Sequence, residues 1–164
     1  KDHVTLLKAF QIFLIKNDKY KLIILGHGNL EDKLKTLVKK LKISKKVVFK
    51  GWVEDTLPYV KKSKFFVLSS VYEGLGNVLL DAINYDTPCI STDCPSGPKE
   101  ILSNGNGGYL VKTKSFNELA NKMEYCAKNY QKSVLKNRIA KKKLNRFLII
   151  NNTKKYFNYL KSFY

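Results

Sequence analysis

Apolar and polar residues alternate along the whole chain in patterns that predict helices and strands in turn. Val4, Leu7, Phe10 and Leu14 recur at helical spacing, and the apolar run that follows them stops at Gly26. The same succession of an amphipathic stripe and a short apolar run continues to residue 111. Strands are predicted at 21–25, 47–49, 65–68, 88–91 and 108–111, and helices at 2–17, 30–41, 57–60, 77–84 and within 115–162.

Short apolar strands separated by amphipathic helices are typical of βαβ units. Because right-handed crossovers place the helices on both faces, we expect an α/β fold with a Rossmann-like, doubly wound parallel sheet. The C-terminal helices should begin with a capping box formed by Ser115 and Glu118. Ligands of such sheets bind beyond the carboxyl ends of the strands, so the informative loops are 26–29, 51–55, 69–77 and 92–100.

The length of 164 residues fits one domain that spans residues 1–164. No apolar run approaches the roughly 20 residues of a membrane-spanning helix, and the start at Lys1 does not resemble a signal peptide, so we expect a cytoplasmic protein. Cys89, Cys94 and Cys126 show neither paired spacing nor nearby histidines. They are predicted to be reduced, unreactive thiols, and no metal site is expected.

The formal net charge of +18 raises the question of a nucleic-acid partner. Only Arg138 and Arg146 among the 31 basic residues are arginines, although arginine is favoured for bidentate contacts with bases and phosphates. We therefore expect no nucleic-acid binding. Attraction of clustered lysines such as Lys141, Lys142 and Lys143 to anionic lipid remains an alternative, as does a merely solvated helix face.

The loop of residues 69–77 places an acid and two glycines between a buried strand and the start of a helix. Free backbone amides at such a position bind phosphate, assisted by the helix dipole. Glu73 would be repelled by the phosphate itself, so it should face neutral sugar hydroxyls, and Asp81, eight residues later, could accept hydrogen bonds from a vicinal diol. A pair of surface acids near a helix N-terminus explains the spacing equally well.

The loop of residues 26–29 is weaker evidence on its own. Gly26 and Gly28 allow a tight turn and close approach of a ligand to the backbone. Glu31 stands where a dinucleotide-binding fingerprint needs a third glycine, so a nicotinamide-dependent dehydrogenase is disfavoured. His27 between the glycines fits a polar turn residue and a ligand-facing residue about equally.

The segment from Ser70 to Ala82 resembles the two-acid motif of glycosyltransferase family 4, in which seven residues separate two acids. Other segments match the same family in the same order, namely 24–28, 48–52, 86–93, 97–102 and 107–111. The resemblance implies the C-terminal, donor-binding half of a retaining GT-B glycosyltransferase. Such an enzyme transfers a sugar from a nucleoside diphosphate sugar, here expected to be a UDP-sugar, to a hydroxyl in glycan or glycolipid synthesis, without a cofactor or a bound metal.

The resemblance also implies individual roles. Glu73 and Lys1 are the expected catalytic residues, since Glu73 would contact the donor sugar and Lys1 the diphosphate. Asp81 would hold the ribose, and Trp52 and Val53 would lie against the base. The remaining donor-binding residues are expected to be Gly26, Gly28, Ser70, Gly74, Leu75, Gly76, Asn77 and Val78.

Two departures from the family pattern affect these expectations. Asp81 replaces the usual glutamate and is one methylene shorter, which loosens the expected ribose clamp. The matched segments begin within the family's second domain, so the N-terminal acceptor-binding domain of the intact enzyme is expected to lie outside these residues. The isolated chain should then be weakly active or inactive. The alternative is a non-catalytic sugar-nucleotide-binding module that needs a separate acceptor-domain partner.

Overall fold

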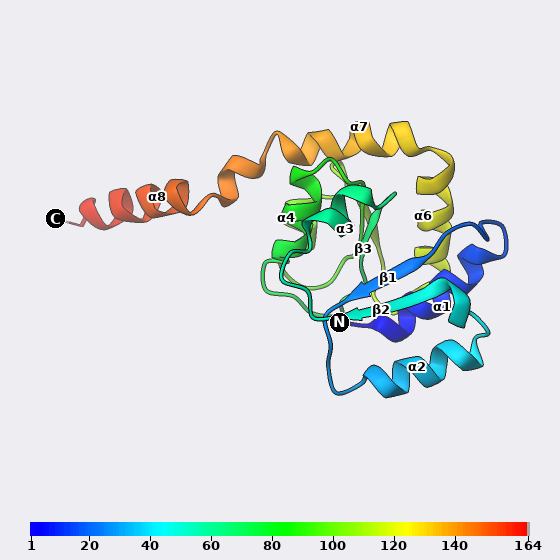
Figure 1. Cartoon of the computed structure of the whole chain (residues 1–164). Coiled ribbons are helices and arrows are strands. Elements are labelled where there is room, and N and C mark those ends of the chain that lie inside the picture. Colours follow the sequence, from blue (N-terminus) through cyan, green and yellow to red (C-terminus); the bar gives the residue numbers. More distant parts are fainter. Residues whose placement is uncertain (164) are drawn as a thin grey trace.

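Helices and strands alternate as the hydrophobic pattern predicts. The computed structural model describes residues 1–163 (Figure 1). The strands are β1 (Leu22–Leu25), β2 (Val47–Gly51), β3 (Phe66–Leu68), β4 (Cys89–Thr92) and β5 (Tyr109–Val111). The α-helices are α1 (His3–Leu14), α2 (Glu31–Lys40), α3 (Leu57–Lys62), α4 (Asn77–Asn84), α5 (Pro98–Ile101), α6 (Phe116–Lys128), α7 (Tyr130–Lys141) and α8 (Ile149–Lys161), with the 3-10 helices η1 (Ser44–Lys46) and η2 (Leu144–Phe147).

All strand pairs are parallel, which confirms the predicted α/β class. The strands nevertheless form two hydrogen-bonded sheets, β1-β2 and β3-β4-β5, and not one continuous sheet. Leu22 pairs with Val47 in the first sheet, and Ile90 lies between Val67 and Tyr109 in the second. Apolar runs identify strands but not their neighbours, so the sequence pattern could not reveal this division.

Two hydrophobic cores cover the two faces of the three-stranded sheet. Successive strand residues point to opposite faces, so Ile90 of β4 joins the core shared with α1 and α6, whereas Cys89 joins the core shared with α4 and α7. Val67 and Leu68 of β3 divide in the same way. Helices therefore lie on both faces, as expected of a doubly wound arrangement.

Packing of aromatic side chains connects the two sheets. Phe13 of α1 contacts Tyr20, which precedes β1, with ring centroids 5.0 Å apart. Phe13 also packs edge-on against Phe65, which precedes β3, at 5.9 Å. Because α1 crosses from one sheet to the other, its buried face fixes the strands of both sheets in one framework.

Two local predictions require correction. Ser115 precedes α6 but makes no side-chain cap, and Glu118 accepts a hydrogen bond from the backbone N–H of Lys112 at 3.0 Å. The predicted capping box is therefore wrong, because the turn that follows β5 uses the carboxylate instead. The short helix α5 also escaped prediction, since its four residues are too few to show a hydrophobic period.

The three cysteines are free and buried in the described part of the chain, in agreement with the prediction of unreactive thiols. Burial raises the pKa of Cys126 to about 11, so the thiol stays protonated at neutral pH. No helix within residues 1–163 is both long enough and apolar enough to cross a bilayer. The helix α8 projects away from the rest of the molecule (Figure 1).

Candidate functional site

The turn between β3 and α4 is the centre of the candidate site. Gly76 caps α4 in the left-handed conformation with φ of 86°, a region that glycine adopts without steric cost. The helix then begins at Asn77, as predicted, and Leu79 N–H already donates to Gly76 O at 2.8 Å. The chain thus turns sharply from a buried strand into a helix.

Five consecutive backbone amides at this turn are free to bind a ligand. Among the described residues, the N–H groups of Gly74 to Val78 donate to no other group. Gly74, Leu75, Asn77 and Val78 are exposed. A row of unpaired donors at a helix N-terminus attracts anions, because the N–H dipoles and the helix dipole point the same way.

Glu73 stands directly before these amides and is held by two donors. Its Oε1 accepts hydrogen bonds from Lys1 Nζ and from Ser70 Oγ. Burial by itself would raise the pKa of Glu73, but the hydrogen bonds from Lys1 and Ser70 outweigh burial and lower the pKa below its usual value. Glu73 is therefore ionised at neutral pH, in a fixed position.

Lys1 reaches Glu73 because the start of α1 is anchored beside β3. Asp2 caps this helix, accepting from Thr5 N–H at 3.0 Å, and Asp2 O accepts from Ser69 Oγ at 2.9 Å. The N-terminus accordingly lies beside the residues that follow β3. The structure thus brings three predicted site residues, Lys1, Glu73 and Ser70, together at the carboxyl end of β3, although no contact among them was predicted.

A second turn, between β4 and α5, supports the first one through hydrogen bonds. None of its residues was among the predicted site residues. Thr92 Oγ1 donates to Ser70 O at 2.5 Å, and Ser96 Oγ donates to Glu73 O at 3.0 Å. These contacts join residues more than 20 positions apart in the sequence. No local signal could have identified them.

Gly97 in the second turn packs its backbone against the first. Its φ is 74°, and a Cβ at this position would lie 2.1 Å from Leu75 O and 2.8 Å from Gly74 O. Such distances are far below van der Waals contact, so no side chain is compatible with the observed placement of the two turns. Gly97 therefore sets the position of the free amides.

Asp81 lies on α4 and presents an unpaired carboxylate. Its side chain is exposed, and among the described residues it forms no salt bridge. Asp86, two residues beyond the helix, is by contrast paired with Lys141 at 2.7 Å. Of these two acids, Asp81 is the one free to accept hydrogen bonds from a ligand.

The loops after β1 and β2 form a second group of predicted residues. Gly26 N–H donates to Gly51 O at 2.6 Å, and both glycines have positive φ angles of 91° and 67°. Trp52, which follows, is 72% exposed, and Val53 is half-buried. Gly28 and His27 are exposed. These two loops therefore present solvent-accessible backbone and the exposed indole of Trp52.

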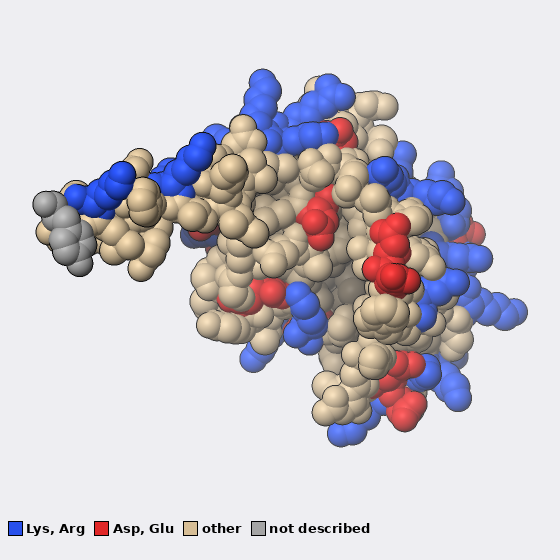
Figure 2. Space-filling model, turned by 60° about the vertical axis from the view of Figure 1, so that its left-hand side comes forward, with Lys and Arg blue, Asp and Glu red and all other residues tan. Residues whose placement is uncertain are grey.

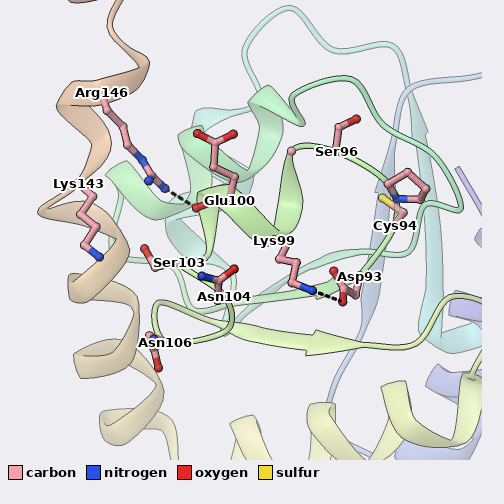
Figure 3. A pocket seen from close by; sticks show the side chains of 12 residues that line it. Asp93, Cys94, Ser96, Lys99, Glu100, Ser103, Asn104, Asn106, Lys143 and Arg146 are labelled. Atoms are coloured by element: carbon pink, nitrogen blue, oxygen red, sulfur yellow. Dashed lines mark hydrogen bonds and ion pairs between the residues drawn. The ribbon is translucent and has the colours of Figure 1, made fainter.

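An open depression of about 730 Å³ lies next to the second turn (Figure 3). The segment of residues 93–97, α5 and the turn that follows it line one side of the depression, and Lys143 and Arg146 of η2 line the other. Lys99 pairs with Asp93 at 3.5 Å, and Arg146 donates to the backbone oxygen of Glu100. The lining is thus a mixture of both charges, and the segment 93–97 connects it to the turn that holds Glu73.

Comparison with known proteins identifies matches along most of the chain. The family model described as glycosyl transferases group 1 matches residues 1–146. An N-acetylgalactosaminyltransferase of Campylobacter jejuni that acts on a diphospho-undecaprenol-linked sugar is 34% identical over 119 residues, which are 73% of this chain and 32% of that protein. The chain spans about a quarter to a third of the length of such curated relatives (24% and 32%).

Solved structures share the fold. A TarM mutant from S. aureus, crystallised with Fondaparinux, α-GlcNAc-glycerol and UDP, superposes with a TM-score of 0.89 at 21% identity, covering 96% of this chain and 32% of that chain. Anabaena HepE in complex with UDP gives a TM-score of 0.87 at 21% identity, covering 99% and 45%. At these identities the likeness concerns the fold alone.

Substitution of Gly97 tests the bracing of the two turns. Gly97→Ala should lower the free energy of unfolding by about 1–3 kcal/mol beyond the cost of positive φ, because the new Cβ overlaps Leu75 O. It should also speed amide hydrogen exchange at residues 74–78. Gly105→Ala is the matched control, since Gly105 has φ of 86° but only an ordinary contact at 3.8 Å. Equal losses in the two variants would contradict the bracing role.

The lowered pKa of Glu73 predicts a pH-dependent contribution to stability. Because the folded pKa lies below the unfolded value of about 4.3, ionised Glu73 stabilises the fold above that value, and the contribution is lost as pH falls through the folded pKa. The difference in free energy of unfolding between the chain and Glu73→Gln should be constant from about pH 8 to 6 and shrink below about pH 4. Urea unfolding across this range measures it, and a pH-independent difference would refute the assignment.

Proposed function

Because this chain belongs to the glycosyl transferases group 1 family, we propose that it is the donor-binding domain of a retaining GT-B glycosyltransferase of family 4. The proposed reaction moves a sugar from a nucleoside diphosphate sugar to a hydroxyl group in glycan or glycolipid synthesis. The single observation that supports it best is the row of free amides from Gly74 to Val78 beside the fixed carboxylate of Glu73. This arrangement suits a ligand with an anionic diphosphate and a neutral sugar.

The donor is proposed to lie across the carboxyl ends of the strands. Its diphosphate accepts hydrogen bonds from the amides at residues 74–78, and its ribose diol donates to Asp81. The sugar hydroxyls donate to Glu73, whose carboxylate would repel the phosphates but accepts hydroxyls. The base stacks near Trp52 and Val53, and Gly26 and Gly28 let the backbone approach the ligand closely.

UDP is the proposed nucleotide. Support comes from the TarM and HepE structures, both of which contain UDP. The family model covers the segments in which the proposed donor residues lie, including residues 24–28 and 70–82. A pyrimidine base is compatible with the flat, exposed indole of Trp52.

The proposed chemistry proceeds on one face of the sugar. The bond between the anomeric carbon and the leaving phosphate oxygen breaks, and the acceptor hydroxyl oxygen bonds to the same carbon from the same side. The acceptor proton passes to the leaving phosphate oxygen, so no general base is required. Charge that accumulates on the diphosphate is stabilised by preorganised amides and by Lys1. In this proposal the amides and Lys1 stabilise the charge on the diphosphate without a metal ion.

Lys1 would exchange partners during binding. In the structure its ammonium group is paired with Glu73, so the two charges compensate each other. An arriving diphosphate offers Lys1 a stronger anionic partner nearby and leaves Glu73 to the sugar hydroxyls and Ser70. Lys1 is thereby proposed to bind the diphosphate and Glu73 to bind the sugar.

The shorter side chain of Asp81 is proposed to weaken the grip on the ribose. The family resemblance implies a glutamate at this position, and aspartate reaches about one methylene less far. Acceptor binding is proposed to need a further domain, because the chain spans only a quarter to a third of its curated relatives (24% and 32%). The isolated chain should therefore bind the donor weakly and transfer sugar poorly.

Calorimetric titration with UDP tests the ribose assignment. Asp81→Asn should weaken UDP binding about tenfold, because the charged acceptor of two hydroxyl hydrogen bonds is lost. Asp86→Asn is the matched control and should bind UDP within about twofold of the unmodified chain, since Asp86 is engaged with Lys141 instead. Equal affinities of the two variants, or no UDP binding by the unmodified chain, would reject the proposal.

A second titration separates the sugar from the nucleotide. Glu73→Gln should weaken binding of a UDP-sugar by at least about fivefold, because Glu73 is assigned to the sugar hydroxyls. The same variant should change the affinity for UDP alone far less. A comparable loss for both ligands would show that Glu73 only supports the turn.

A further inference from the structure

The side chain of Arg146 joins the C-terminal segment to the helix α5. Its guanidinium group, which projects from η2, donates to the backbone oxygen of Glu100 in α5. The same group lies over the ring of Phe147, with 4.6 Å between its central carbon and the ring centroid. Its Nε is shielded from solvent and has no hydrogen-bond partner within residues 1–163. The head group is thus held between two elements that lie 46 positions apart in the sequence.

Arginine differs from the residue type that the rest of the chain uses for positive charge. Among the 31 basic residues only Arg138 and Arg146 are arginines. A planar guanidinium can donate in its plane and stack on an aromatic ring at the same time, whereas an ammonium is a point charge on a flexible stem. Arg146 makes both kinds of contact. The geometry at this position therefore uses the property that distinguishes arginine from lysine.

The helix α5 needs support from other elements. It has only four residues, and a helix this short gains too few internal hydrogen bonds to be stable alone. Its inner side is fixed, because Ile101 is buried in the core. Its outer residues Lys99 and Glu100 are exposed, and the exposed ion pair of Lys99 with Asp93 contributes little. Arg146 is therefore the contact that fixes the outer side of α5 to a distant part of the chain.

The position of α5 determines the position of the second turn. Ile101 N–H donates to Gly97 O at 2.9 Å, so the start of the helix carries Gly97 with it. Gly97 in turn lies against the first turn, where its Cβ would be 2.1 Å from Leu75 O, and Ser96 Oγ donates to Glu73 O at 3.0 Å. An outward movement of α5 would therefore separate the two turns and release the segment that carries the free amides.

Arg146 itself lies apart from the proposed donor. Figure 3 shows Arg146 and Lys143 on one side of the depression and Lys99 with Asp93 on the other. None of the residues assigned to the donor is among those that line this depression in the described chain. Figure 2 shows lysines and arginines spread widely over the face in view, so the loss of one charge changes the long-range attraction of a diphosphate little. Arg146 therefore acts on the donor site through α5 and the second turn.

We propose that Arg146 is a positioning residue for the donor site. By holding α5 against η2 it keeps Gly97 in contact with Leu75, and it thereby keeps the amides of residues 74–78 in the arrangement that binds the diphosphate. The inference rests on the proposed function, since the diphosphate is the proposed ligand of these amides. It gives the C-terminal segment a part in donor binding, although this segment supplies no group to the ligand.

Titration with UDP and NMR relaxation of the backbone amides test the proposal. Arg146→Ala should weaken UDP binding at least about fivefold, because UDP would then have to order the turn as it binds. Without UDP, the order parameters of residues 74–78 should fall from near about 0.85, the value of a rigid backbone, toward about 0.6. Arg146→Lys, which can still donate to Glu100 O, should recover part of both losses.

Lys143→Ala is the matched control. Lys143 is exposed, lines the same depression and forms no salt bridge with the described residues. The variant loses the same charge as Arg146→Ala, so it should keep the UDP affinity within about twofold and leave the order parameters unchanged. Equal effects of the two variants on either measurement would overturn the proposal, as would unchanged order parameters in Arg146→Ala.

The two measurements also separate this proposal from the proposed function. Absence of UDP binding by the unmodified chain would reject the proposed function, whereas the order parameters would still report whether Arg146 holds the turn. Thermal unfolding checks that each variant folds. If Arg146→Ala does not fold, the comparison of Arg146→Lys with Lys143→Ala takes its place, and equal order parameters in that pair would overturn the positioning role.

Discussion

Close contact between the turns that follow β3 and β4 is the constraint on which the site depends. Gly97 lies against the carbonyls of Gly74 and Leu75, and Thr92 and Ser96 donate to the backbone of the same turn. The two hydroxyls occupy the carbonyls of Ser70 and Glu73, whereas the N–H groups of Gly74 to Val78 make no hydrogen bond within the described chain. The site is therefore formed more by backbone groups than by side chains. The parallel sheet beneath the two turns holds these backbone groups in position.

Local pattern was sufficient for the strands and the longer helices, but not for the short helix α5 or for the way the elements assemble. The helix Asn77–Asn84 was predicted with its boundaries, because Gly76 before it and the apolar period within it act over a few residues. The separation into two sheets and the bracing by Ser96 and Gly97 depend on partners that folding brings together from distant positions. The spacing of Glu73 and Asp81 was visible in the sequence, whereas the contact of Glu73 with Lys1 spans 72 positions.

Charge is distributed unevenly along the molecule. Acidic residues are confined to the part of the chain up to Glu124, where they meet lysines at the strand ends and along helices. Every lysine, arginine, aspartate or glutamate position after Glu124 is a lysine or an arginine. The formal charge of +18 is therefore the sum of a moderately basic body and a strongly basic C-terminal region, and composition alone could not separate the two.

Leu148, in an extended conformation between η2 and α8, is positioned as a hinge. The helix beyond it contains 13 residues, about 20 Å at 1.5 Å per residue. A rotation of about 30° at this single position would sweep the far tip by about 10 Å while η2 stays fixed to α5. The direction of α8 relative to η2 is thus set by the two backbone torsions of Leu148, and it can change without repacking of either core.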